Sequence, residues 1–198
     1  MQLAEQTTDL YLANQLSPEP PAAAVAKVDP RPFAGWYRDA DSHSVLQVIA
    51  SGNEVEIFGQ HFKPLDASHF AGPDESDAVF SRQQNGATRL TLTFKDTAPQ
   101  IFETYEPLKA SQESFSQYAG EYTSTEVEAT YRLYAKEGKL TLAANWQEPF
   151  VLEPTVRDEF QGPYGSALVF RRDSNGRIFG FEAFAGRVRN IAFVKTSK

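Results

Sequence analysis

The chain has 198 residues, a net charge of −7 at pH 7 and no cysteine. The acidic balance disfavours nucleic acid and anionic membrane surfaces as partners, because both are bound through an excess of lysine and arginine. The absence of cysteine excludes disulfide bonds and thiolate metal sites, and it leaves the redox compartment open.

The composition indicates an all-β protein. The chain contains 15 phenylalanines and 8 tyrosines, which favour the pleated, half-buried surfaces of strands. Twelve glycines and twelve prolines interrupt it often, as the turns between short strands require. The length suits one or two domains. No run of about 18 apolar residues predicts a membrane span, and the first residues show no signal-peptide pattern.

The first 29 residues are predicted to form a short helix and a linker. Leu3, Leu10 and Tyr11 fall on one side of a helical wheel, which predicts a helix over Gln2–Asn14. A proline-rich stretch from Ser17 ends this helix, because proline lacks a backbone N–H. A single helix of this length is not stable alone in water. We therefore expect its apolar side to pack against a barrel wall or a neighbouring molecule.

From Phe33 onward the apolar residues recur with a period of two, as in β-strands. Clean alternation marks Glu54–Phe58, Leu90–Phe94 and Ile101–Tyr105, and Asn85-Gly86 predicts a type I′ hairpin turn. About seven or eight such strands at intervals of about ten residues are typical of an antiparallel barrel or sandwich.

The order of these features occurs twice in the chain. Residues 33–37 (Phe-Ala-Gly-Trp-Tyr) return 85 positions later as residues 118–122 (Tyr-Ala-Gly-Glu-Tyr). Further along, Val79-Phe80 corresponds to Val169-Phe170 at an offset of 90. The growth of the offset indicates small loop insertions in the second copy. A repeat of this length is a duplicated domain rather than a solenoid unit, which has about 20–50 residues.

The duplication predicts three segments: a helix and linker at 1–29, a first barrel at 30–109 and a second barrel at 110–198. Each copy carries its own full set of turns, which favours two tandem antiparallel barrels of about eight strands each. Closure into barrels also removes exposed strand edges. The alternative is one larger barrel or sandwich that shares strands between the repeats.

Known catalytic and metal-binding motifs are absent from the chain. His43, His61 and His69 lack the spacings of a zinc site, and we expect them on the surface or at a pocket rim. The acidic loop at residues 74–77 lacks the alternating ligands and central glycine of a calcium loop. Ser-x-x-Lys, Gly-x-Ser-x-Gly, phosphate-loop and dinucleotide motifs do not occur. We therefore expect no catalytic residue, no cofactor and no metal in this chain.

Near the C-terminus, Arg187 and Arg189 alternate along a predicted strand and would point to the same side. If they point inward, they need carboxylate partners or a ligand anion, because an unpaired buried charge is costly. If they point outward, they are solvated or face a partner domain. Glu182 lies across the tight Ala185-Gly186 turn, and we expect it to pair with one of the two arginines.

Several of these motifs resemble one known family. The opening motif at residues 33–37, which contains Trp36, its second copy at 118–122 and the closing Gly186–Asn190 look like parts of the lipocalin-like C-terminal domains of penicillin-binding-protein-like serine hydrolases. These enzymes belong to the beta-lactamase-related superfamily. Further matching segments are Glu128–Tyr131, Gly138–Leu140 and Asp158–Phe160. The resemblance covers about residues 30–198. The candidate binding or structural residues are Trp36, Glu182, Arg187 and Arg189.

The resemblance implies a function without catalysis in this chain. The family's Ser-x-x-Lys, Tyr-x-Asn and Lys-Thr-Gly boxes have no counterpart, so no catalytic residue is carried over. The implied role is an accessory C-terminal region that shapes substrate access or subunit contacts in a serine hydrolase or peptidase. The helix at Gln2–Asn14 resembles the end of the missing hydrolase domain, which would be the partner in the same polypeptide.

Two further expectations accompany this role. The chain is also a candidate for forming a homo-oligomer. A periplasmic or extracellular location is expected for the parent enzyme. The alternative function is a free-standing lipocalin-like carrier of a small apolar ligand, because eight-stranded barrels hold ligands when their interiors leave room.

Overall fold

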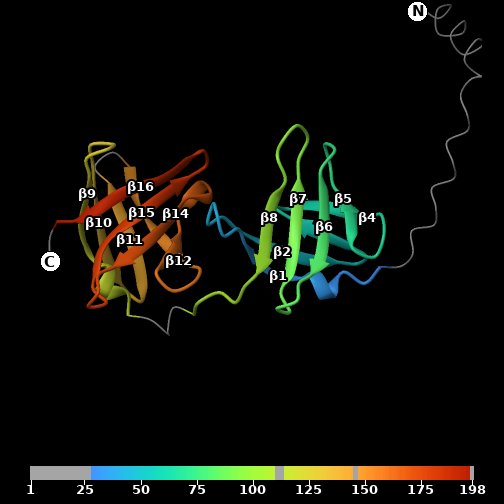
Figure 1. Ribbon diagram of the computed structural model, residues 1–198, viewed down its shortest axis with the longest axis horizontal. Helices are drawn as coiled ribbons and strands as arrows, with labels where there is room; N and C mark the ends of the chain where they lie inside the picture. Colours follow the sequence, from blue (N-terminus) through green and yellow to red (C-terminus); the bar gives the residue numbers. More distant parts are fainter. Residues whose placement is uncertain (1–27, 110–113, 145–146, 197–198) are drawn as a thin grey trace, which may run out of the picture.

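The computed structural model describes residues 28–109, 114–144 and 147–196. Within them the chain forms two closed antiparallel barrels of eight strands each, arranged in tandem (Figure 1). This arrangement confirms the all-β prediction and the choice of two barrels over a single merged one. The predicted helix Gln2–Asn14 lies outside the described residues. In the described part of the chain, none of the helices has the length and apolarity to cross a membrane.

The first barrel is built from the first repeat. It follows the short 3₁₀ helix η1 (Arg31–Phe33). Its strands are β1 (Gly35–Arg38), β2 (Val45–Ser51), β3 (Glu54–Ile57), β4 (Gln60–Pro64), β5 (His69–Ala71), β6 (Asp77–Arg82), β7 (Thr88–Thr93) and β8 (Gln100–Thr104). Each strand pairs with the next one along the chain, and β1 closes on β8 with Tyr37 opposite Thr104.

The second barrel repeats this plan. The 3₁₀ helix η3 (Phe115–Tyr118) precedes it, and η4 (Pro163–Gly165) lies between two of its strands. Its strands are β9 (Gly120–Ser124), β10 (Ala129–Lys136), β11 (Lys139–Ala144), β12 (Gln147–Pro154), β13 (Glu159–Gln161), β14 (Ala167–Arg172), β15 (Ile178–Ala185) and β16 (Val188–Lys195). The barrel closes where β16 pairs with β9, with Lys195 opposite Tyr122.

The duplicated opening motif has the same structure in both barrels. The Tyr37 hydroxyl donates to the carbonyl of Phe33, and the Tyr122 hydroxyl donates to the carbonyl of Tyr118, at 2.8 Å in each case. Both donor tyrosines are fully buried, and burial raises the pKa of each hydroxyl. The glycine of the motif has φ of 152° and 149° in the two copies, a conformation that glycine adopts readily. The motif therefore ties the first strand of each barrel to the short helix before it.

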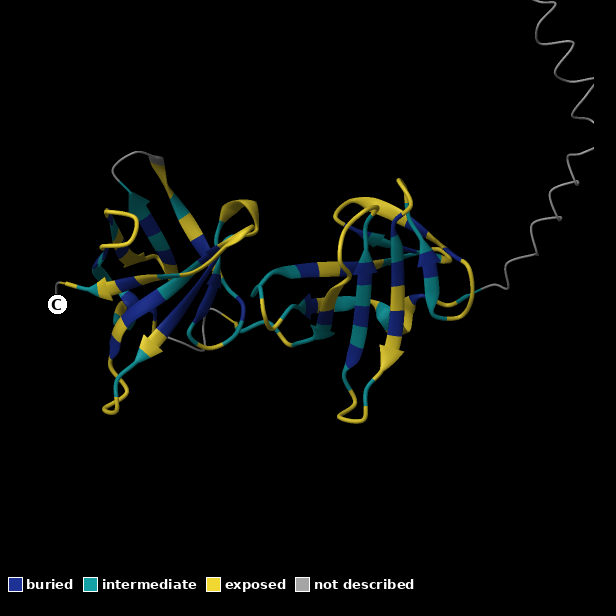
Figure 2. Ribbon diagram, turned by 45° about the horizontal axis from the view of Figure 1, so that its top comes forward, coloured by how far each residue is buried: buried dark blue, intermediate teal, exposed yellow. Residues whose placement is uncertain are grey.

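Side chains from alternating strand positions fill the barrel interiors, as the bands of buried and exposed residues in Figure 2 show. In the second barrel the Phe170 ring is central, because it contacts the rings of four other aromatic residues. Its centroid lies 4.7–6.0 Å from those of Tyr118, Phe160, Phe181 and Tyr122. Aromatic pairs at such distances contribute about 0.5–1.5 kcal/mol each beyond the area that they bury.

Replacing Phe170 with alanine is expected to lower the free energy of unfolding by about 3–5 kcal/mol, because it opens a cavity among four rings. Phe179 offers a matched control on the neighbouring strand β15, where its side chain is 49% exposed. The Phe179→Ala change should stay within about 0.5 kcal/mol. Guanidinium unfolding followed by circular dichroism measures both values, and equal losses would contradict the assigned core.

Candidate functional site at the junction of the two barrels

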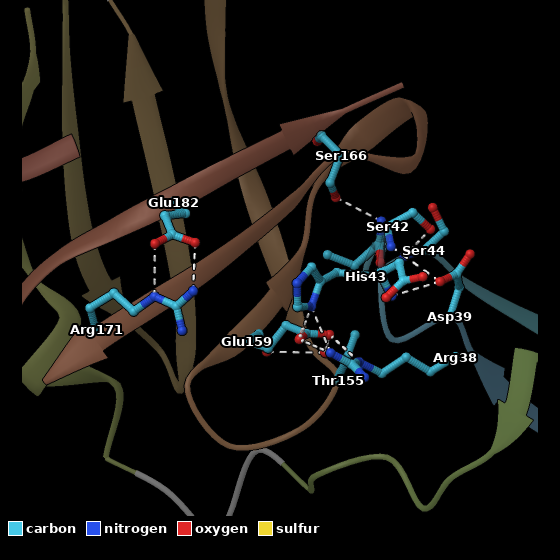
Figure 3. Close-up of polar contacts among 12 residues, drawn as sticks. Arg38, Asp39, Ser42, His43, Ser44, Thr155, Glu159, Ser166, Arg171 and Glu182 are labelled. Carbon is cyan, nitrogen blue, oxygen red and sulfur yellow. Dashed lines mark hydrogen bonds and ion pairs between the residues drawn. The ribbon is translucent and has the colours of Figure 1, made fainter. Parts of the chain in front are cut away.

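A buried glutamate connects the two barrels. Glu159 begins strand β13 of the second barrel and is only 2% exposed. Arg38, at the end of β1, and His43, in the loop between β1 and β2, reach it from the first barrel. Figure 3 shows both side chains pointing toward the carboxylate. We call this set of residues, with Thr155, the junction cluster.

Every oxygen of the Glu159 carboxylate has partners. The Arg38 Nε donates to Oε1 at 2.6 Å, and its Nη2 donates to Oε2 at 2.5 Å, which makes the pair bidentate. The Thr155 hydroxyl also donates to Oε1, at 2.9 Å. The His43 Nδ1 lies 2.7 Å from Oε2. Bidentate pairs between arginine and a carboxylate combine strength with a defined geometry.

The contacts of His43 indicate which ring nitrogen carries the proton. Its Nδ1 lies close to both Glu159 Oε2 and Arg38 Nη2, at 2.7 and 2.6 Å. An unprotonated Nδ1 would turn its lone pair toward the negatively charged oxygen, which is repulsive. A protonated Nδ1 instead donates to that oxygen, to which Arg38 Nη2 also donates. We therefore assign a proton to Nδ1.

The junction cluster changes the ionisation of its members. Burial alone would raise the pKa of Glu159, but the hydrogen bonds and charges of Arg38 and His43 outweigh it and hold the pKa at about 2. Burial raises the pKa of the nearby Tyr105 to about 12, and the negative charge of Glu159 adds to this effect. Glu159 is therefore ionised over the whole physiological range.

An apolar contact lies beside the junction cluster. Ala167, Val169 and Phe184 form a small cluster, separate from the barrel core, on strands β14 and β15. They are 0–9% exposed. The His43 ring centroid lies 4.4 Å from that of Phe184. The loop between β1 and β2 thus meets an apolar patch on the outside of the second barrel.

The repeat shows that this patch is specific to the second barrel. Ala167 and Val169 correspond to Asp77 and Val79 of the first barrel, at the offset of 90. In the first barrel Asp77 pairs with His69 near the surface, and Val79 is 39% exposed, whereas Val169 is 9% exposed. The same position of the sheet therefore faces solvent in one barrel and a neighbouring domain in the other.

Two clefts flank the junction cluster. The first has a volume of about 770 Å³, and its charged lining residues carry both signs. They are Arg38, Asp39, Asp41, Arg89, Glu103 and Arg189. The second cleft, of about 560 Å³, is lined mostly by apolar groups, including Trp36, Pro107 and Leu108. Tyr105 lines both clefts.

All four residues singled out in the sequence lie outside the junction cluster. Trp36 is 40% exposed in the second cleft, and Arg189 lines the first. Arg187 is exposed on the β15–β16 turn. In the described residues neither arginine forms an ion pair.

The predicted pairing of Glu182 with one of these arginines is wrong. Glu182 instead accepts two hydrogen bonds from Arg171 on the neighbouring strand β14, at 3.0 and 2.5 Å. The physical reason is a β-bulge in β16, where an extra residue interrupts the register and Asn190 has φ of 60°. The bulge shifts the register so that Glu182 lies opposite Ala192, while both arginines are exposed nearer the turn.

The sequence did not single out the residues of the junction cluster. His43 was expected on the surface or at a pocket rim, but only 16% of its side chain is exposed. His61 and His69 are more exposed, at 53% and 33% of their side chains. The difference between the repeats could have pointed to this cluster, because Glu159 stands where the first copy has His69.

The junction cluster has the parts of an acid–base pair but no nucleophile. Among the described residues, no hydroxyl forms a hydrogen bond with the His43 ring, and its proton on Nδ1 is already directed at a carboxylate. No group of three or more metal-ligating side chains occurs in this part of the chain either. The arrangement is suited to joining two domains rather than to transferring an acyl group.

Comparison with known proteins does not add a relative. No protein-family model matches the chain, and a search of curated proteins returns no match.

Removing one partner of the buried pair is expected to be costly. Arg38→Met leaves the Glu159 charge buried without its main partner, and we expect a loss of about 3–5 kcal/mol in the free energy of unfolding. Arg38→Met combined with Glu159→Met should recover much of this loss, because neither charge remains. Urea unfolding of the two single variants and the double variant gives the coupling energy.

The surface pair of Arg89 and Glu103 is the matched control, since both side chains are 41% exposed. The corresponding change Arg89→Met should cost only about 0–1 kcal/mol. A loss as small for Arg38→Met would show that the junction cluster does not join the barrels.

The ionisation of Glu159 predicts a pH dependence of stability. The folded pKa of about 2 lies below the ordinary value of 4.5, so the stabilisation is complete above about pH 5 and is lost as the pH falls toward 2. The shift corresponds to about 3 kcal/mol. The stability difference between the wild-type chain and Glu159→Gln should therefore shrink between pH 5 and pH 2. A difference that stays constant over this range would contradict the low pKa.

Proposed function

We propose that the two barrels are a non-catalytic accessory region of a beta-lactamase-related serine hydrolase. In this role they shape substrate access or subunit contacts for a hydrolase domain in the same polypeptide. The resemblance of the opening and closing motifs to the lipocalin-like C-terminal domains of such enzymes motivates the proposal. The observation that carries it is the junction cluster, which gives the two barrels a defined relative position.

A defined position matters for an accessory region. A domain that borders an active site must hold its surface in place, and most domain interfaces within one chain are polar and movable. Here a buried bidentate ion pair and an apolar contact act together. The two barrels can therefore act as one rigid body, with the clefts on either side of the junction as its shaped surfaces.

The alternative is a free-standing lipocalin-like carrier of a small apolar ligand, and the filled interior of the first barrel argues against this barrel as its ligand site. Twelve core side chains occupy this interior, and none is more than 3% exposed. They are Tyr37, Leu46, Val48, Val55, Ile57, Phe62, Phe70, Ala78, Phe80, Leu90, Leu92 and Phe102. An interior filled to this extent leaves no space for a ligand of ordinary size.

Labelling of the active serine tests the proposal. The transcript that encodes Met1 is sequenced upstream, and the protein from the complete reading frame is treated with a fluorescent penicillin or fluorophosphonate. We expect label in an upstream hydrolase domain and none in residues 30–198. The isolated chain should hydrolyse neither p-nitrophenyl esters nor D-amino acid p-nitroanilides.

Two results would count against this function. The first is a reading frame without any serine hydrolase upstream of Met1. The second is labelled serine within residues 30–198, which would make the chain itself catalytic.

A further inference from the structure

The second barrel is open at one end. Two adjoining cavities lie there, of about 250 and 230 Å³, and both are lined by Tyr131, Ala183 and Ala185. The β9–β10, β13–β14 and β15–β16 connections gather at this end, as an up-and-down meander requires (Figure 1). Each cavity is smaller than the roughly 300 Å³ at which ligand pockets begin, but together they fall within the usual range.

Comparison of the repeats shows how this end of the second barrel differs from the same end of the first. Phe80 pairs with Leu90 in the first barrel, and the corresponding Phe170 pairs with Phe181 in the second. Phe94 lies four residues after Leu90, and Ala185 lies four residues after Phe181. Ala185 therefore occupies the position of Phe94. Phe94 packs against the core of the first barrel, whereas Ala185 is exposed. The first barrel thus has the Phe94 ring at this position, whereas the second barrel has only the methyl group of Ala185.

An aromatic residue stands at the rim of the opening. Tyr164, in η4, is fully exposed and lines the second of the two cavities. Its φ of 56° places it in the left-handed region, which is uncommon for a bulky side chain. Backbone strain of this kind costs about 1–3 kcal/mol and often occurs where a ligand is held.

The lining has no charge. None of the residues around the two cavities is Asp, Glu, Lys, Arg or His, although the chain as a whole carries a net charge of −7. The polar side chains in the lining are Tyr131, Tyr164 and Ser166. The floor is aromatic, because the Tyr131 ring stacks on Phe193 with centroids 4.6 Å apart and planes 13° apart. A charged ligand would lose its hydration here without gaining a partner.

From these observations we infer that the open end of the second barrel binds a small, uncharged, flat apolar molecule. The ligand lies against the stacked rings of Tyr131 and Phe193, next to the small side chains of Ala183 and Ala185, and Tyr164 covers it from the rim. This inference goes beyond the proposed accessory function. It does not depend on a hydrolase domain, so its failure would leave the labelling experiment unaffected.

The uncharged dye N-phenyl-1-naphthylamine is a suitable probe, because its fluorescence rises when it leaves water. Titration of the chain should give a saturable increase with one dye molecule per chain. The Ala185→Phe change, which restores the ring of the first barrel, should weaken binding at least tenfold. Ala135→Phe is the matched control, since Ala135 is exposed at the opposite end of the same barrel, beside the β10–β11 turn. It should leave the affinity unchanged.

A second pair of variants tests the rim. Tyr164→Gly should weaken binding several-fold, whereas Phe58→Gly should not change it. Phe58 is a close match, because it is also an exposed aromatic residue with positive φ, at 62% exposure and 53°, and it lines neither cavity. Both changes relieve the same kind of backbone strain, so the comparison isolates the loss of the Tyr164 ring.

Three outcomes would overturn the inference. One is the absence of saturable binding by the wild-type chain. Another is binding that survives Ala185→Phe, or that Ala135→Phe weakens equally. The third is a dye site that appears only when a dimer dissociates on dilution, measured by light scattering, because the occupant would then be a second copy of the chain.

Discussion

The relative position of the two barrels depends on one buried carboxylate. Moving a carboxylate out of water costs several kcal/mol unless partners replace its hydration. The hydration that the Glu159 carboxylate loses is replaced mainly by Arg38 and His43 of the other barrel. From its own barrel, Thr155 supplies a single hydrogen bond. Separation of the barrels would return Glu159, Arg38 and His43 to water, so the net strength of the junction is the gain from these hydrogen bonds less the hydration that the charges give up. The bidentate geometry fixes the orientation of the barrels more closely than an apolar contact of the same small size would.

Duplication explains how such a junction arises on one side only. Two copies of a barrel begin with identical outer faces, but a tandem arrangement covers the face of just one of them. The covered copy has Glu159 and Ala167 where the solvent-facing copy has His69 and Asp77. His69 and Asp77 pair with each other across neighbouring strands and stay near the surface. The exchange of a local polar pair for a long-range ion pair and an apolar patch is what a change from surface to interface requires.

The sequence predicted the fold well because its signals are local. Period-two alternation, the Asn-Gly turns and the repeated opening motif each act within a few residues, and they define strands, hairpins and the number of barrels. The junction was not predictable in this way, because Arg38 and Glu159 are 121 residues apart. The prediction that Glu182 pairs with Arg187 or Arg189 was wrong for a third reason. Alternation along β16 assumes a regular strand, and the left-handed Asn190 breaks it without a clear signal in the pattern.

The two barrels are also under different constraints at their corresponding ends. In the first barrel this end carries the β1–β2 loop, and a shift of that loop would displace His43 from Glu159. At this end Phe94 packs against the core of the first barrel. The corresponding end of the second barrel has no such loop to hold, so small residues such as Ala185 are tolerated there. The second barrel therefore combines an uncharged cavity at this end with Ala167 and Phe184, which also belong to the apolar patch of the junction.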